Sequence, residues 1–291
     1  MSATVLLTKY NDIFFGFSEE ITYAKLPSWM TDLTSKIVGG TTAPTPIPWQ
    51  VHVHINRTDK EGIQGCGGTI LDEETILSAA HCYYPKSITT IQFIEAGIVQ
   101  DFSRKGQNIK VKEIIVHPDY DESRKDAKFD NDIAILKLET PLIFNKNVMP
   151  ASLPHPSFNL KPKVAVVSGW GKTRSGARIT AKFLKYVTVP LITNEMCVKP
   201  NTEYEVSEIT SNMICAGDLV NGKRDACEGD SGGPLIISKS DNDETAIIYG
   251  IVSFGFFCGR SDGPGVYVRV SKYINWIQNR MKGNSITNYF T

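Results

Sequence analysis

Residues 228–234 read Glu-Gly-Asp-Ser-Gly-Gly-Pro and place Ser231 inside a Gly-x-Ser-x-Gly pattern. Taken alone, this stretch is compatible with a glycine-rich turn that carries a solvated serine, or with the strained turn that exposes a nucleophile in α/β-hydrolases. The second fold needs a parallel sheet with long helices, and a histidine after the serine. The last histidine of this chain is His155, so the α/β-hydrolase reading fails.

The sequence around this stretch indicates an all-β protein. From Ile37 onward, short apolar or β-branched runs alternate with glycine and proline, which is typical of a barrel or sandwich. Helix signals are weak until the end, where Ser271 could cap a segment from Tyr273 to Met281 with apolar residues at helical spacing. The runs expected to form strands are residues 50–55, 75–78, 91–94, 109–116, 133–138, 164–167, 184–189, 235–237, 246–254 and 265–270.

The overall composition excludes some classes of function. The 291 residues include 31 basic and 31 acidic side chains, which gives a net charge of zero and argues against nucleic acid as a partner. A hydrophobic content of 41% is enough for a full core. No apolar run approaches the ~20 residues that a membrane-spanning helix needs.

Six widely spaced cysteines without a CxxC pair favour disulfides over a zinc ribbon, and hence an oxidising compartment. Their spacing alone leaves all of the roughly 15 possible pairings open. Export would require a signal peptide, yet no basic residue precedes Lys9 and the apolar run Val5–Leu7 is short. An incomplete N-terminus would resolve this conflict.

A serine hydroxyl becomes a good nucleophile only when a base removes its proton. The best candidate base is His81, which follows an apolar run and two small residues, and precedes Cys82, which could pin the backbone. The other four histidines lie along an expected strand, where they would be exposed or satisfied in the core, or beside prolines: His52, His54, His117 and His155.

The base needs a carboxylate that holds its tautomer. Asp132 opens the apolar run at residues 133–136, where an unpaired carboxylate would be costly to bury. Asp130, two residues earlier, is expected in a solvated loop. The candidate catalytic residues are therefore His81, Asp132 and Ser231, in that order along the chain.

Taken together, these segments resemble the trypsin/chymotrypsin family of serine proteases. The order His, Asp, Ser is the order of that family, and the resemblance runs from Ile37 to about Met281. The segments that carry it are Ile-Val-Gly-Gly at 37–40, Ala-Ala-His-Cys at 79–82, Asp-Ile-Ala-Ile-Leu at 132–136, Ser-Gly-Trp-Gly at 168–171, Gly-Asp-Ser-Gly-Gly-Pro at 229–234, Ser-Phe-Gly at 253–255 and Pro-Gly-Val-Tyr at 264–267.

This resemblance implies a fold of two six-stranded antiparallel β-barrels, with the active site between them and a C-terminal helix. It implies a serine endopeptidase in which Ser231 attacks, His81 transfers the proton and Asp132 orients His81. The backbone N–H groups of Gly229 and Ser231 would form the oxyanion hole. The expected division of the chain is a pro-segment at 1–36, the protease domain at 37–282 and a tail at 283–291.

The resemblance also implies a preference for Arg or Lys, because the base of the specificity pocket in this family lies six residues before the nucleophile, here at Asp225. Gly255 and Gly265 match the pocket walls. Three departures qualify this expectation: Ala226 stands where many trypsins carry Ser, Phe257 stands where Gly is usual, and Glu228 near the pocket mouth would repel acidic substrate residues.

Activation and disulfides follow from the same resemblance. Cleavage between Lys36 and Ile37 would free an α-amino group, which would pair with Asp230 and set the oxyanion hole. The precursor would then be nearly inactive, and a protease that prefers basic residues would activate it. The implied disulfides are Cys66–Cys82, Cys197–Cys215 and Cys227–Cys258.

The remaining expectations concern partners and modifications. Protein or peptide substrates, an activating protease and protein inhibitors are the expected partners of a secreted monomer, with no nucleic acid, membrane, cofactor or metal. A calcium site in residues 95–107 is disfavoured because oxygen ligands are few there. Asn56 begins a glycosylation sequence. The alternative function is a catalytically silent binding protein on the same fold, although none of the three candidate catalytic residues is missing.

Overall fold

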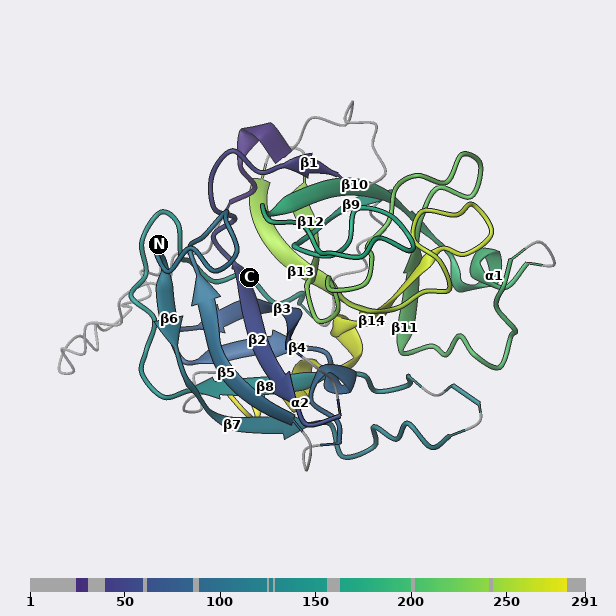
Figure 1. The fold of residues 1–291 in the computed structure, drawn as a ribbon. Coiled ribbons are helices and arrows are strands. Elements are labelled where there is room, and N and C mark those ends of the chain that lie inside the picture. Colours follow the sequence, from purple (N-terminus) through teal and green to yellow (C-terminus); the bar gives the residue numbers. More distant parts are fainter. Residues whose placement is uncertain are drawn as a thin grey trace, which may run out of the picture.

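The computed structural model describes residues 25–30, 40–59, 62–85, 89–124, 126–127, 129–155, 163–199, 202–240 and 243–281. Two antiparallel sheets lie side by side (Figure 1). The N-terminal sheet has the order β6-β5-β2-β3-β4-β8-β7, with bounds β2 Gln50–Arg57, β3 Ile63–Asp72, β4 Thr75–Ser78, β5 Thr89–Ala96, β6 Gln107–Ile109, β7 Val111–Val116 and β8 Ala134–Leu138.

The C-terminal sheet closes into a barrel because β9 pairs with both β12 and β10. Strand β1 adds to the edge of β10. The order is β1-β10-β11-β14-β13-β12-β9, with bounds β1 Thr41–Thr42, β9 Val164–Gly169, β10 Lys185–Ile192, β11 Met213–Ala216, β12 Pro234–Ser240, β13 Asp243–Phe254 and β14 Gly265–Arg269.

The all-β prediction is confirmed, with one difference in how the two halves close. The C-terminal half is a closed six-stranded barrel, as expected. The N-terminal half is a curled sheet of seven strands, and within the described residues no ladder joins its edge strands β6 and β7. The expected run at residues 109–116 is split, because β6 ends at Ile109 and β7 begins at Val111.

Helices are short. They are η1 Ser28–Met30, η2 Ala80–Cys82, η4 Val270–Lys272, α1 Asn194–Cys197 and α2 Ile274–Gln278. The expected cap at Ser271 is wrong: Ser271 lies inside η4, and the residue that precedes α2 is Tyr273, which makes no side-chain cap. Among the helices of the described ranges, none is long and apolar enough to cross a bilayer.

The C-terminal segment from Tyr273 onward packs against the N-terminal half. The hydroxyl of Tyr273 donates to the side-chain oxygen of Asn131 over 3.0 Å, and its ring meets the ring of His117 edge-on at 5.3 Å. Ile274 and Ile277 are buried in the same apolar cluster as the N-terminal sheet. The end of the chain therefore holds the loop just before Asp132.

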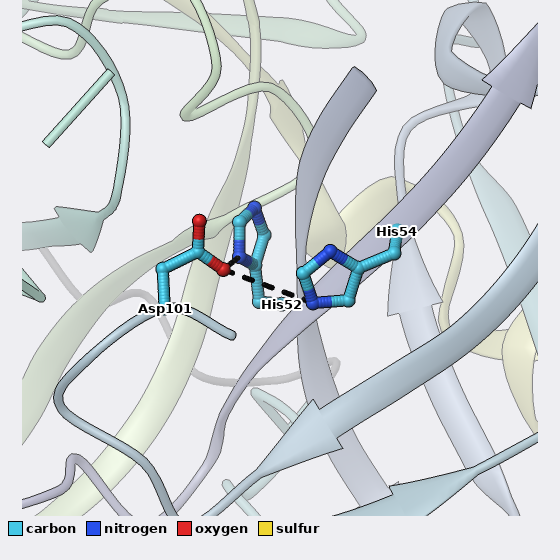
Figure 2. A group of neighbouring side chains, drawn as sticks. All are labelled: His52, His54 and Asp101. Carbon is cyan, nitrogen blue, oxygen red and sulfur yellow. Dashed lines mark hydrogen bonds and ion pairs between the residues drawn. The ribbon is translucent and has the colours of Figure 1, made fainter. Parts of the chain in front are cut away.

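Strand β2 shows how alternation sorts side chains between the two faces of the sheet. Val51, Val53 and Ile55 are buried in the core of the N-terminal half. His52 and His54 are spaced by two residues and so share the opposite face. They are buried there beneath the loop that carries Asp101 (Figure 2). This position agrees with the expectation that they are satisfied within the fold.

Glycines on β3 let the two halves approach closely. A Cβ at Gly67 would lie 2.6 Å from the Cα of Gly233, which belongs to the turn after Ser231. A Cβ at Gly68 would lie 2.6 Å from a side-chain carbon of Ile76 and 2.8 Å from one of Val51. At Gly67 only a residue without a side chain fits, so this strand brings the N-terminal sheet against the turn around Ser231.

Residues 25–30 are packed onto the domain although they precede the expected cleavage point. Leu26 and Met30 are buried and belong to the main apolar cluster. The ring of Trp29 contacts the ring of Tyr186 at 4.9 Å, and the Tyr186 hydroxyl donates to the Trp29 carbonyl over 2.9 Å. Lys25 forms a β-bridge with Thr245. These residues of the expected pro-segment are therefore docked on the C-terminal half.

Candidate active site

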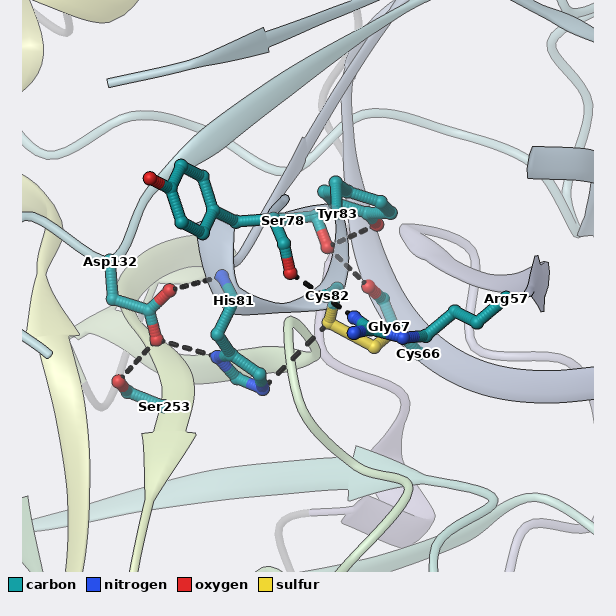
Figure 3. The surroundings of a disulfide bond; sticks show 10 residues. Arg57, Cys66, Gly67, Ser78, His81, Cys82, Tyr83, Asp132 and Ser253 are labelled. Carbon is teal, nitrogen blue, oxygen red and sulfur yellow. Dashed lines mark hydrogen bonds and ion pairs between the residues drawn. A yellow bond between two sulfur atoms is a disulfide. The ribbon is translucent and has the colours of Figure 1, made fainter. Parts of the chain in front are cut away.

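Asp132 holds His81 through two hydrogen bonds (Figure 3). Its carboxylate accepts from the backbone N–H of His81 over 2.8 Å and from the imidazole Nδ1 over 2.7 Å. The Asp132 side chain is fully buried, whereas that of His81 is 19% exposed. Because an ionised carboxylate only accepts, Nδ1 carries a proton, and the neutral imidazole keeps a lone pair on Nε2.

A third donor to Asp132 comes from the other sheet. The hydroxyl of Ser253, near the end of β13, donates to Oδ2 of Asp132 over 2.5 Å. Ser253 belongs to the Ser-Phe-Gly segment at 253–255, to which the sequence assigned no catalytic role. Its contact arises only where β13 meets the loop before β8, and local sequence gives no signal of such a meeting.

The turn around Ser231 is held between the two halves. The backbone N–H of Gly67 on β3 donates to the Ser231 carbonyl over 2.7 Å, and that of Gly232 donates to the Val252 carbonyl on β13 over 2.8 Å. Gly232 has a φ of +78°, and a Cβ there would lie 2.2 Å from Oγ of Ser78. Both the conformation and the space therefore require glycine after Ser231.

Ser231 and Asp225 line one cavity of about 230 Å³, together with Gly255 and Gly265. The carboxylate of Asp225 is buried and accepts from the backbone N–H of Gly259 over 3.1 Å through Oδ2. Its Oδ1 has no hydrogen-bond partner within the described ranges. Burial raises the pKa of Asp225 to about 8. The cavity therefore ends on an acceptor that lacks a donor.

The two glycines leave space in this cavity in different ways. A Cβ at Gly265 would lie 2.5 Å from Oδ1 of Asp225, so a side chain there would cover the carboxylate. A Cβ at Gly255 would have no atom nearer than the Tyr204 hydroxyl at 3.8 Å. Glycine at position 255 therefore keeps empty volume inside the cavity and does not relieve a clash.

The three departures from the family pattern all line the same cavity. Phe257 is 47% exposed and packs against the guanidinium of Arg260, whose central carbon lies 5.0 Å from the ring centre. Glu228 forms an ion pair with Lys172, which offsets part of its charge. Ala226 contributes no hydroxyl.

Asp230, beside Ser231, is a buried carboxylate held by two backbone donors. Its oxygens accept from the N–H groups of Gly171 over 2.7 Å and Cys227 over 2.9 Å. Burial nevertheless raises the pKa of Asp230 to about 6. A second cavity lies beside it and is lined by Asp230 and Gly40. Lys36 and Ile37, the expected cleavage site, lie outside the described residues.

The structure contains three disulfides, Cys66–Cys82, Cys197–Cys215 and Cys227–Cys258. The first joins β3 to the turn of His81, and the third joins two segments that line the cavity of Asp225. Both cysteines of the second are buried.

The expectation of a solvated Asp130 is wrong. Its side-chain oxygen accepts from the Thr210 hydroxyl over 2.8 Å and from the Asn212 side-chain amide over 3.1 Å. The carboxylate thus ties the loop before Asp132 to the segment before β11. Asn56, by contrast, is exposed near the end of β2.

Comparison with known proteins decides the family. A model of the trypsin family matches residues 37–277. The chain belongs to the trypsin family. It is 36% identical to pig trypsin over 255 residues, which cover 87% of this chain and 99% of that protein. As a trypsin-family member, it is a serine protease.

Two other relatives are similar at the same level. The chain is 34% identical to the clotting factor G beta subunit of Tachypleus tridentatus, over 88% of this chain and 83% of that protein. It is 36% identical to rat transmembrane protease serine 11G over 80% of this chain. The chain spans about half the length of that protein, 52%.

Proposed function

We propose that this chain is an endopeptidase, made as an inactive precursor, that hydrolyses peptide bonds after Arg or Lys. The observation that carries the proposal is the single cavity that both Ser231 and Asp225 line. It joins a candidate nucleophile to a buried carboxylate that could select a cationic side chain.

In the proposed reaction, Nε2 of His81 accepts the proton of the Ser231 hydroxyl as Oγ attacks the scissile carbonyl. Asp132 stabilises the imidazolium through the 2.7 Å contact with Nδ1. The imidazolium then protonates the leaving amine, which leaves an acyl-enzyme. Water, deprotonated by His81, hydrolyses this ester and regenerates Ser231.

The negative charge on the tetrahedral oxygen would be stabilised by the backbone N–H groups of Gly229 and Ser231. One such donor is typically worth about 3 kcal/mol in the transition state. Gly229 has a φ of +96°, where side chains are strained, and a Cβ there would lie 3.1 Å from the Cα of Gly171. These constraints support a fixed backbone geometry at the proposed oxyanion hole.

Specificity for Arg or Lys rests on Asp225. An entering guanidinium or ammonium group would donate to its unpartnered Oδ1 and hold the carboxylate in its charged form. An apolar side chain would leave that buried oxygen unsatisfied, which typically costs about 1–3 kcal/mol. Gly255 and Gly265 keep the path to the carboxylate open.

Activation rests on Asp230 and the cavity beside it. A new α-amino group at Ile37 would give the buried carboxylate a cationic partner. Gly40 lines that cavity and lies three residues after Ile37, a span of at most about 10 Å for extended chain. Insertion would therefore add an ion pair next to the turn that contains Gly229 and Ser231.

The three disulfides support an oxidising, extracellular location for this protease. Its proposed partners are protein or peptide substrates, a protease that cleaves after Lys36, and protein inhibitors that occupy the cavity of Asp225.

The test is to treat the full chain with immobilised trypsin, to remove that trypsin, and to measure hydrolysis of reporter peptides that end in Arg, Lys or Phe. We expect cleavage after Arg and Lys, and none in a Ser231→Ala variant. Absence of cleavage by the wild-type chain would support a binding protein instead. Faster cleavage after Phe would refute the role of Asp225. A Lys36→Gln variant should resist activation, and normal activation of that variant would refute the cleavage site.

A further inference from the structure

We propose that His52, His54 and Asp101 form a binding site for a Zn²⁺ ion, separate from the residues assigned to catalysis. One ligand atom from each of these side chains lies within 4.8 Å of the other two (Figure 2). Nδ1 of His52 is 2.8 Å, and Nε2 of His54 is 3.8 Å, from Oδ1 of Asp101. Ligand atoms at about 2.0–2.2 Å from a tetrahedral zinc ion lie roughly 3.4 Å apart, so the two distances bracket this value.

The fold holds each of these ligands in place. Stacking on Trp170, at 4.9 Å between ring centres and 10° between planes, fixes the ring of His52. A Cβ at Gly65 would lie 2.4 Å from Nε2 of His52, so only glycine leaves room for that ring. Asp101 is anchored by its backbone N–H, which donates to the Lys182 carbonyl over 3.0 Å.

Burial acts on both the imidazole and the carboxylate of this site. Burial, followed by the charge of His52, lowers the pKa of His54. Burial is the largest single influence on Asp101 and raises its pKa, but the hydrogen bond from His52, the charges of His52 and His54 and the backbone N–H of Phe102 together outweigh it, so the pKa of that carboxyl is lowered. A neutral imidazole and an ionised carboxylate are the forms that coordinate metal ions.

The chemistry of these atoms selects the class of ion. Two imidazole nitrogens and one carboxylate oxygen favour zinc or a related transition metal over calcium, which prefers oxygen ligands. The nearby carboxylate of Glu95 is already used: it accepts from the backbone N–H groups of Phe102 and Arg104, each over 3.0 Å. It also contacts Nε2 of His54 over 3.0 Å. Zinc would displace the proton that lies between Nε2 of His54 and Oε2 of Glu95.

A cavity of about 440 Å³ gives an ion access to the three ligands, all of which line it. Five further polar or charged side chains line the same cavity: Gln64, Lys172, Arg178, Thr180 and Glu228. Lys172 is paired with Glu228, which leaves Arg178 as the cation with most influence on an entering metal. A water molecule or a carboxylate could take a fourth coordination position from this side.

The test uses the full chain with Ser231→Ala, which prevents self-digestion. Calorimetric titration with Zn²⁺ should show one saturable site, and Co²⁺ should give the visible absorption of a tetrahedral complex. Zinc at 100 times its dissociation constant should raise Tm by about 5–10 °C. Binding should release protons, so the apparent affinity should fall as the pH drops from 8 to 6.

Variants His52→Gln and His54→Gln should each weaken zinc binding at least about tenfold. The matched control is His117→Gln, which alters another histidine near a carboxylate: its Nδ1 lies 4.0 Å from Asp119, with no third ligand grouped with it in the described part of the chain. This control should bind zinc with unchanged affinity. Circular dichroism checks folding, and if a glutamine variant unfolds, Asp101→Asn replaces it with the same expected loss.

Three results would overturn the proposal. The first is the absence of a saturable site in the wild-type background. The second is a zinc affinity that changes by less than threefold from the wild type in folded variants at His52, His54 or Asp101. The third is binding that disappears in His81→Gln instead, because the ion would then sit in the active site. In each case the contacts of His52 and His54 with Asp101 would serve only to hold the loop of Asp101 on β2.

Discussion

Replacing Asp225 by Asn removes the charge at the end of the specificity cavity while keeping the shape of the side chain. Removing one partner of a buried ion pair costs about 3–5 kcal/mol. In the empty cavity the pKa of Asp225 is raised to about 8 by burial. At pH 7 the carboxyl therefore holds a proton that an Arg substrate must expel, at a cost of about 1.4 kcal/mol for one pH unit.

The expected loss in kcat/KM toward an Arg peptide is the difference between these two free energies. It amounts to about 15- to 450-fold at pH 7. At pH 9 the carboxyl of the empty cavity is mostly ionised, so the loss grows to about 150- to 5,000-fold. The ratio between wild type and Asp225→Asn should thus widen as the pH rises.

The assay is steady-state hydrolysis of matched Arg and Phe reporter peptides by the activated enzymes at pH 7 and pH 9. Ionisation of His81 and of the new α-amino group cancels in the ratio, since both enzymes carry them. Asp119→Asn, in which an exposed carboxylate is changed, is the control and should stay within twofold of the wild type. A ratio below threefold for Arg at both pH values would show that Asp225 does not select the cation.

Three further outcomes are expected. Ser253→Ala removes a hydrogen-bond donor from Asp132. Because hydrogen bonds to charged groups are worth about 1.5–3 kcal/mol, kcat should fall at least tenfold while KM stays within twofold. An unchanged kcat would contradict this positioning role. Gly265→Ala would put a Cβ 2.5 Å from Oδ1 of Asp225. The Cβ would displace the contact between the substrate cation and this oxygen, so KM for Arg peptides should rise at least about tenfold. Equal KM values for the variant and the wild type would refute that geometry. The double variant Cys197→Ala/Cys215→Ala removes a disulfide whose cysteines have a sequence separation of 18. It should lose about 3 kcal/mol of unfolding free energy, which calorimetry would detect as a fall in Tm of roughly 6–12 °C. A shift under 2 °C would show that the buried cystine does not stabilise the fold.

Alternation in the sequence predicted most strands well, because in an antiparallel sheet one face enters the core. Residues 75–78 form β4 with the predicted bounds. Strand β3 was missed for a physical reason. Its glycines, such as Gly65 and Gly67, are poor strand formers, and they are required by contacts with His52 and Gly233 that local sequence does not contain.

The candidate site was predicted from the local chemistry around His81 and Asp132 and from short motifs and their order along the chain. His81 and Asp132 are separated by 51 positions, and their 2.7 Å contact depends on the packing of the N-terminal sheet. Asp130 shows the limit of such interpretation. Its loop position suggested solvent, but Thr210 and Asn212, which are distant in sequence, supply donors. Contacts between the two halves of the molecule were in general the part that could not be predicted.

The docked residues Lys25–Met30 give the proposed activation a dependence on dilution. Before cleavage, Leu26 and Met30 are held against the domain by the continuous chain, so their association is intramolecular. After cleavage at Lys36 no cystine links the peptide to the enzyme. Burial of two such side chains and one hydrogen bond contributes about 4–7 kcal/mol. Once the chain is cut, the loss of translational and rotational freedom on rebinding opposes this gain. The peptide would stay bound in a concentrated store and leave on release into a larger volume, uncovering Tyr186.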